Sequence, residues 1–291
     1  MSRLFFKSLA LVITLLSISN LLADNGKPDL WKVEKAGNIS YLFGSIHLGS
    51  NAMYPLSTTV NDAYLSTDNL VVEIDIKPED EASLMSMIQK YGIDMSLPLE
   101  QRLSPETLSL FKKKCREKNL PCEQFAAYKV WLVSLQLAVM QIQQLGYKEE
   151  LGIDKHFLSL AHKSNKHVIS LETAESQVEI FIKFDQQQQE LMLVQTLETT
   201  NDSIYDLFNS WKSGDDKTML TLLTKYNDKP GAMEMYKVLL DDRNVKMAAQ
   251  LAKNINANKS LFVVVGAGHI IGKNGIVELL KKDGFTLTQI Q

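Results

Sequence analysis

Cysteine and histidine are scarce in this chain. It contains two Cys, five His and 14 Gly among 291 residues. Small secreted domains held together by disulfides need many more Cys, and collagens need Gly at every third position, so both classes are excluded. Hydrophobic residues make up 45% of the chain, whereas disordered proteins are poor in them. The composition predicts an ordinary globular protein, and the few His are the first candidates for a catalytic or metal centre.

Long hydrophobic runs are also few, and the main one lies at the N-terminus. Arg3 and Lys7 precede an apolar run over residues 9–18, and the small residue Ala23 follows it. This order is typical of a secretory signal peptide, here residues 1–23. A retained membrane anchor is the alternative, but the run is shorter than the roughly 20 apolar residues of a spanning helix. We expect an exported protein, periplasmic or secreted, with no membrane span once the signal is removed.

A strongly basic balance is missing. Lys and Arg number 31 against 34 Asp and Glu, which gives a formal net charge of −3. The only compact basic run is residues 112–114 with Arg116, a pattern typical of a solvated helix face. Because nucleic acids are bound by a clustered basic surface, nucleic acid is not expected as a partner.

The two cysteines, Cys115 and Cys122, are close in sequence. Disulfides persist in an exported protein, so a local disulfide and two free thiols both stay open. The spacing is not Cys-x-x-Cys, and the chain has no second Cys pair to complete a zinc cage. Neither a redox motif nor a structural zinc site is predicted.

Hydrophobic periodicity predicts an α/β protein. Strand patterns cover residues 30–36, 39–44, 70–76, 167–171, 261–265 and 285–288, and the first two flank the turn residues Gly37 and Asn38. Helical patterns cover residues 78–91, 105–118, 123–145, 153–164, 174–200 with breaks, and 244–256. Strands separated by helices indicate a mainly parallel central sheet with large helical insertions. No long linker divides the chain, so residues 24–291 are predicted to form a single domain.

Two of the five His follow predicted strands in the same pattern, Gly-x-x-His. The segments are YLFGSIHLGS, which contains His47, and VVVGAGHIIG, which contains His269. Gly at a strand end lets the backbone turn sharply or approach a ligand, and α/β folds place their sites at the carboxyl edge of the sheet. We expect His47 and His269 to meet there. The other three, His156, His162 and His167, are interpreted as surface or packing residues.

Carboxylates occupy comparable places. In LVVEIDI, Glu73 and Asp75 share one face of a strand that otherwise looks buried. Burial of an unpaired carboxylate is costly, so Glu73 is a candidate for metal binding, cation binding or proton transfer, with a salt bridge at a strand edge as the alternative. Glu172 ends the next strand, where a helix-cap or loop role is the alternative. Periodicity alone assigns Asp154 as a helix cap.

Several well-known motifs are missing. The chain has no Gly-x-Ser-x-Gly elbow, so Ser45 is not predicted to be a nucleophile. It has no His-Glu-x-x-His helix and no phosphate-binding loop. Gly266, Gly268 and Gly272 are spaced one residue too far apart for the dinucleotide fingerprint, so a nicotinamide or flavin enzyme is not expected.

The motifs together resemble one known family. YLFGSIHLGS, LVVEID, GYKEELGID, ISLETAESQ, DDRN and VVVGAGHIIGKNGIVELLKKDGF occur in that order and span most of the chain. This set is similar to the TraB/GumN family, which includes the Tiki metalloproteases and is related in fold to the erythromycin esterases and ChaN-like proteins. One departure is Ser45, where Thr is common.

The resemblance implies a metal-dependent hydrolase-like site in which a divalent cation, Mn, Co or Zn, is held by His47, Glu73 and His269. It also implies further roles, catalytic for Glu73, His269, Arg243 and Glu172, and substrate-binding for Arg243, Asn244 and Asp154. Two imidazoles and a carboxylate leave positions open on a cation, which can then activate a water toward a peptide or another acyl substrate. Asp75 or Glu172 would accept the proton of that water.

Three alternatives stay open. In a metal-free variant, His269 or Glu73 acts directly as the base toward water. A non-catalytic periplasmic protein would bind a peptide or small ligand in the same cleft without turnover. A structural factor for export or surface polysaccharide assembly would need neither His47 nor His269.

Overall fold

A computed structural model describes residues 26–291, so the predicted signal peptide, residues 1–23, lies outside the described residues. The strands are β1 (Leu30–Lys35), β2 (Asn38–Ser45), β3 (Asn69–Val72), β4 (His167–Ser170), β5 (Leu261–Gly266) and β6 (Thr286–Gln289). They form one sheet in the order β4-β3-β5-β2-β1-β6. The four strands β4, β3, β5 and β2 are parallel, whereas β1 pairs antiparallel with β2 and β6. The α/β class is confirmed, with a mixed sheet.

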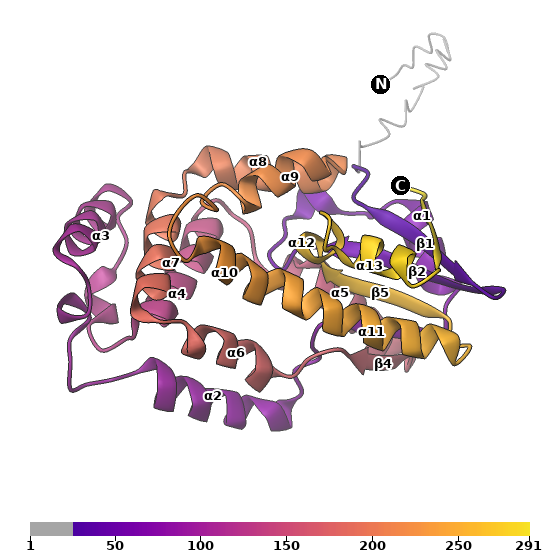
Figure 1. The fold of residues 1–291 in the computed structure, drawn as a ribbon, viewed down its shortest axis with the longest axis horizontal. Helices are drawn as coiled ribbons and strands as arrows, with labels where there is room; N and C mark the ends of the chain where they lie inside the picture. Colours follow the sequence, from indigo (N-terminus) through magenta and orange to yellow (C-terminus); the bar gives the residue numbers. More distant parts are fainter. Residues whose placement is uncertain (1–25) are drawn as a thin grey trace, which may run out of the picture.

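The central strands read as continuous apolar runs because both faces of the sheet are covered. The residues Leu70 to Val72 and Leu261 to Val265 are all buried. In Figure 1, α11 (Asp242–Asn256) and α13 (Ile276–Lys282) pass in front of the sheet, and α5 (Ile153–Ser164) lies on its other face. A main core therefore surrounds β3, β5 and β2 and fixes the ends of these strands.

The predicted third strand is too long. β3 stops at Val72. Val72 pairs with Ser170 of β4 and with Val264 of β5, and these two pairs are the last of their ladders. Strand alternation therefore does not continue to residue 76, and the expectation that Glu73 and Asp75 share a sheet face is wrong. Asp75 Oδ2 lies 3.1 Å from His162 Nε2, whereas Glu73 belongs to a different cluster described below.

The remaining helices are α1 (Thr58–Leu65), α2 (Pro78–Gly92), α3 (Pro105–Glu117), α4 (Val130–Gln144), α6 (Ala174–Lys183), α7 (Gln186–Glu198), α8 (Asn201–Ser213), α9 (Asp216–Leu223), α10 (Ala232–Tyr236) and α12 (Ala267–Ile270). The prediction for α5 has the observed bounds. The predicted helix over 123–145 is shorter, because Tyr128 forms a β-bridge with Ile93 and the chain becomes α-helical only at Val130. The pattern over 174–200 breaks at Asp185, whose side chain caps α7.

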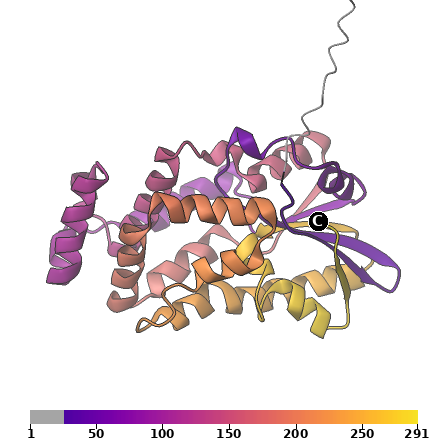
Figure 2. The same cartoon turned by 90° about the horizontal axis from the view of Figure 1, so that it is seen from above.

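A second hydrophobic core lies among α3, α4 and α7. Phe111, Val133, Leu137, Leu193 and Leu197 are among its buried residues. Both views place α3 and the β1–β2 hairpin at opposite ends of the molecule (Figure 1 and Figure 2). Cys115 and Cys122 form a disulfide at this core, which decides between the two alternatives left open by the sequence. Within residues 26–291, no helix is long and apolar enough to cross a membrane.

Candidate functional site

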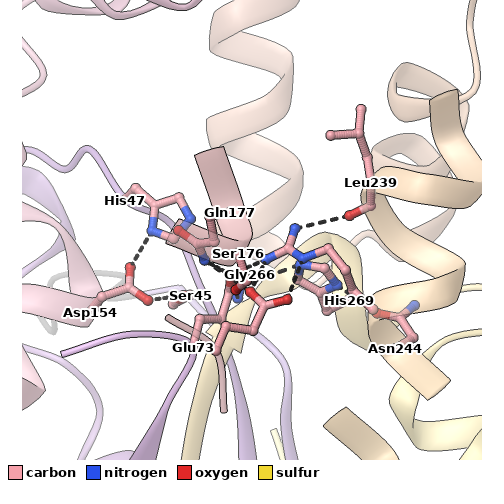
Figure 3. A network of polar contacts seen from close by, with 12 residues as sticks. Ser45, His47, Glu73, Asp154, Ser176, Gln177, Leu239, Asn244, Gly266 and His269 are labelled. Atoms are coloured by element: carbon pink, nitrogen blue, oxygen red, sulfur yellow. Dashed lines mark hydrogen bonds and ion pairs between the residues drawn. The ribbon is translucent and has the colours of Figure 1, made fainter. Parts of the chain in front are cut away.

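Three adjacent parallel strands carry the main candidates to one edge of the sheet. Ser45 of β2 pairs with Gly266 of β5, and Val72 of β3 pairs with Val264 of β5. His47, Glu73 and His269 each follow one of these strand ends. Figure 3 shows Glu73 below and between His47 and His269, with the backbone of Gly266 among them. The sheet therefore unites residues from both ends of the chain.

Gly266 lies where the three side chains converge. A methyl group placed on Gly266 would lie 3.2 Å from Glu73 Oε1, 3.6 Å from His269 Cδ2 and 3.9 Å from His47 Nε2. The glycine of the other turn, Gly44, has a different neighbour, because its methyl group would lie 3.2 Å from Ala267 Cβ. Both glycines thus permit close approach: Gly44 lets the two Gly-x-x-His turns pack together, and Gly266 leaves space between the candidate residues.

His47 is held by a carboxylate. Its Nδ1 lies 2.9 Å from Asp154 Oδ2, and Asp154 Oδ1 accepts a 2.7 Å hydrogen bond from Ser45 Oγ. The negative charge of Asp154 raises the pKa of His47 to about 9. The His47 side chain is nevertheless 62% exposed, so it is the most accessible of the three candidates.

The start of α5 determines this contact. Gly152 is the N-cap of α5, so the periodicity-based assignment of Asp154 as the cap is wrong. A methyl group on Gly152 would lie 2.1 Å from the carbonyl oxygen of His47, and Ile153 N–H donates to the carbonyl of Ile46 at 3.0 Å. Only a glycine at position 152 lets α5 begin this close to the Gly-x-x-His turn that contains His47. Asp154, two residues later, then reaches His47 from behind.

His269 is held by an amide instead. Its Nδ1 lies 2.5 Å from Asn244 Oδ1, while Asn244 Nδ2 donates to the carbonyl of Asn274 at 2.9 Å. The second bond fixes the orientation of the amide, so Nδ1 of His269 carries the proton and Nε2 keeps its lone pair. Burial lowers the pKa of His269 to about 4. Asn244 is 1% exposed and uses both polar groups internally, which does not match the substrate-binding place expected for it.

Arg243 joins the two glutamates. Its Nη2 donates to Glu73 Oε2 at 2.7 Å and to Glu172 Oε2 at 2.6 Å, and its Nε donates to Glu172 Oε1 at 2.8 Å. Glu73 Oε1 accepts from Gly266 N–H at 2.7 Å. Burial opposes ionisation of Glu73, but His269, His47 and Arg243 hold its pKa below the usual range. The buried carboxylate is thus paired and bonded, as its 4% exposure requires.

The donor types suit a divalent cation. Both imidazoles are anchored through Nδ1, as metal-ligating histidines usually are, and Nε2 of each faces the site. Because its pKa is about 9, His47 must lose a proton before its Nε2 can bind a cation. Within residues 26–291, no three His, Cys, Asp or Glu side chains already lie where they could hold one ion. Gly266 and Arg243 engage both oxygens of Glu73. Binding of a cation by this set therefore requires a rearrangement of these side chains.

Comparison with known proteins identifies the family of the chain. The model of the TraB/PrgY/gumN family matches residues 29–289. The chain belongs to the TraB/PrgY/gumN family. Two relatives, each described as "Uncharacterized protein YbaP", are 28% identical to it over 83% of this chain: one from Shigella flexneri, of which 88% is covered, and one from Escherichia coli K12, of which 87% is covered. No solved structure matches the chain.

In this TraB/PrgY/gumN protein, sequence reasoning missed the supporting residues. Gly152 and Gln177 were not singled out, although GYKEELGID and ISLETAESQ contain them. Gln177 Nε2 donates to Glu172 Oε2 at 3.0 Å and thus helps to hold the partner of Arg243. Ser45 has no role predicted from the sequence, whereas its hydroxyl donates a hydrogen bond to Asp154. Such contacts between distant segments have no local sequence signal.

Proposed function

We propose that this TraB/PrgY/gumN protein is an exported, metal-dependent hydrolase that acts on a peptide or another acyl substrate. The convergence of His47, Glu73 and His269 around Gly266 is the observation that carries the proposal. We also infer an architecture related to the erythromycin esterases and ChaN-like proteins, from the same paired motifs at the sheet edge.

The cation would be held by His47, Glu73 and His269. When bound, it would supply a Lewis acid and an acidified water. The chain supplies orientation and charge: Asp154 holds the first imidazole from behind and Asn244 holds the second. Arg243 adds positive charge at the same edge, which suits an anionic substrate group or the oxygen that becomes negative during acyl hydrolysis. Glu172 keeps Arg243 in place and is a second carboxylate for the proton.

The test combines metal content with cleavage. The purified protein and its His47→Ala and His269→Ala variants are analysed for bound Mn, Co and Zn, and each is incubated with a mixed peptide library. His167→Ala is the matched control, because His167 is exposed on β4 away from this cluster. We expect metal and cleavage in the wild type and the control, and loss of both in the two variants. Metal content near zero in all four proteins would remove the metal from the proposal, and cleavage that persists without metal would favour direct base catalysis.

One observation favours a different function for the same site. Both oxygens of Glu73 are engaged by Arg243 and Gly266, a closed network that would suit a non-catalytic protein that binds a peptide or small ligand. In that case, library members would be retained by the protein but left intact. Cleavage products that depend on His47 and His269 would exclude the binding protein.

A further inference from the structure

The helical part of the molecule contains an apolar cavity. It has a volume of about 270 Å³ and lies among α4, α7, α8 and α9. Six of its 13 lining residues have aliphatic side chains: Ala138, Ile142, Ile204, Leu207, Leu222 and Leu223. The amide of Gln141, which also lines it, donates to the carbonyls of Leu137 and Thr196. Its interior therefore suits a hydrocarbon chain.

A second, larger cavity adjoins the first. It has a volume of about 700 Å³ and lies among α3, α7 and the segment after α9. Four lysines line it, Lys113, Lys114, Lys225 and Lys229, together with one carboxylate, Glu198, which accepts a hydrogen bond from Tyr226. Its apolar floor comes from Leu110, Leu191 and Val194. Lys225 and Tyr226 line both cavities, so the apolar space opens beside a cationic one. Two of these lysines come from the basic run at residues 112–114, which the sequence suggested was only a solvated helix face.

The lysines have partners that a ligand can replace. Glu117 Oε2 lies 2.9 Å from Lys114 Nζ, and Asp228 Oδ2 lies 3.4 Å from Lys229 Nζ. Such exposed ion pairs are weak, because water and salt screen them. Lys225 Nζ lies 5.2 Å from the ring centroid of Tyr226, at the boundary that the two cavities share. An anionic group placed there would meet a positive charge while a chain attached to it entered the apolar cavity.

We propose that the two cavities form one binding site for an anionic amphiphile with a single alkyl chain. The alkyl chain lies among α4, α7, α8 and α9, and the carboxylate or phosphate group lies at Lys225 and the neighbouring lysines. The site is separate from His47, Glu73 and His269, none of which lines either cavity. Leu223 provides a contact between the two sites, because it lines the apolar cavity and a methyl group on Gly268 would lie 3.2 Å from its Cδ1.

Calorimetric titration of the purified protein tests both parts of the ligand. The probes are dodecanoate and dodecyl phosphate, which differ in the anionic group, dodecanol, which has no charge, and inorganic phosphate, which has no chain. We expect saturable binding of at least one dodecyl anion at one site. Dodecanol should bind at least roughly tenfold more weakly than that anion, and phosphate should show no detectable binding. Equal binding of dodecanol and the dodecyl anions, or binding of phosphate as tight as that of dodecyl phosphate, would overturn the proposal.

Two variants locate the site. Ala138→Phe fills the apolar cavity, and Lys225→Gln removes the lysine that lines both cavities. Ala249→Phe and Lys253→Gln, on the exposed side of α11, are matched controls that line neither. We expect Ala138→Phe to weaken binding by roughly tenfold or more and Lys225→Gln to reduce the preference for the anion over dodecanol. All variants contain the same N-terminal apolar run, residues 9–18. Any binding of amphiphiles to that run is therefore the same in each variant and does not affect the comparison.

Wild-type affinity in both variants would place the ligand elsewhere and refute the site. Circular dichroism checks that each variant is folded. If Ala138→Phe does not fold, Lys225→Gln against Lys253→Gln decides the question, because both changes are at surface lysines. The result does not depend on any hydrolase activity, so failure here and failure of the proposed function are distinguishable.

Discussion

The two Gly-x-x-His turns follow adjacent parallel strands, yet they place their imidazoles in opposite surroundings. The side chain of His47 is 62% exposed and contacts a carboxylate, whereas that of His269 is 5% exposed and contacts an amide. The turns themselves have the same spacing, so the difference comes from the helices that face them, α5 for His47 and α11 for His269. The motif sets where each imidazole lies, whereas its surroundings shift its pKa: the carboxylate of Asp154 raises that of His47, and burial lowers that of His269.

The largest expected effect comes from removing Arg243, whose positive charge keeps Glu73, the neighbour of both imidazoles, ionised. Arg243→Met would leave Glu73 and Glu172 buried without their partner, and loss of one member of a buried ion pair costs about 3–5 kcal/mol of unfolding free energy. Urea denaturation measures it. Lys237→Met is the control, because Lys237 pairs with Asp242 at the surface and its loss should change stability little. Equal, small losses in both variants would show that Glu73 does not depend on Arg243.

A smaller effect is expected where a helix meets the first turn. Gly152→Ala would place a methyl group 2.1 Å from the backbone oxygen of His47, so α5 must shift and the contact between Asp154 and His47 must lengthen. Overpacking of this kind costs about 1–3 kcal/mol. Gly266→Ala is the matched change in the second turn, where the nearest atom to the methyl group is Glu73 Oε1 at 3.2 Å, the end of a side chain rather than backbone. We expect Gly152→Ala to be less stable in urea than Gly266→Ala, and the reverse order would contradict the role given to α5.

The sequence predicted the elements of the sheet better than the contacts of the site. The apolar runs at β3 and β5 and the paired Gly-x-x-His patterns are local signals, and they were sufficient to place His47 and His269 at one edge. The ladder end at Val72 was missed because it depends on where β3 stops pairing with β4 and β5. Likewise, Asp154 and Asn244 support the two imidazoles through contacts across more than 100 and about 25 residues of sequence, respectively, and spacing does not reveal such contacts.

The opposite surroundings predict opposite pH dependences of stability. The pKa of His47 is raised from 6.5 to about 9, so its stabilising contribution is complete below pH 6.5 and is lost as the pH rises through about 9. The pKa of His269 is lowered from 6.5 to about 4, so its contribution is complete above pH 6.5 and is lost as the pH falls through about 4. Relative to wild type, His47→Gln should remove the alkaline slope of unfolding free energy and His269→Gln the acidic slope.

Denaturation from pH 3 to 10 measures both slopes, and only differences between a variant and the wild type are compared. This is necessary because burial and Asp216 raise the pKa of Asp29 to about 8, and Asp29 therefore titrates in the same range in every variant. If both variants changed the same slope, the two imidazoles would not differ as the structure indicates.

The smallest effect is expected from a substitution that makes the turn at His47 resemble the turn at His269. Ser45 and Ala267 hold the same position in the two turns, directly after the glycine, and Ser45 Oγ donates to Asp154. Ser45→Ala removes that bond, which helps to hold the pKa of Asp154 below its usual range, and should cost about 0.5–1.5 kcal/mol. Ser45→Thr keeps the hydroxyl and is the control. Since Asp154 still faces His47 in both variants, NMR titration should find the His47 pKa raised in each. A return of that pKa to the ordinary value in Ser45→Ala alone would mean that the serine, rather than α5, places the carboxylate.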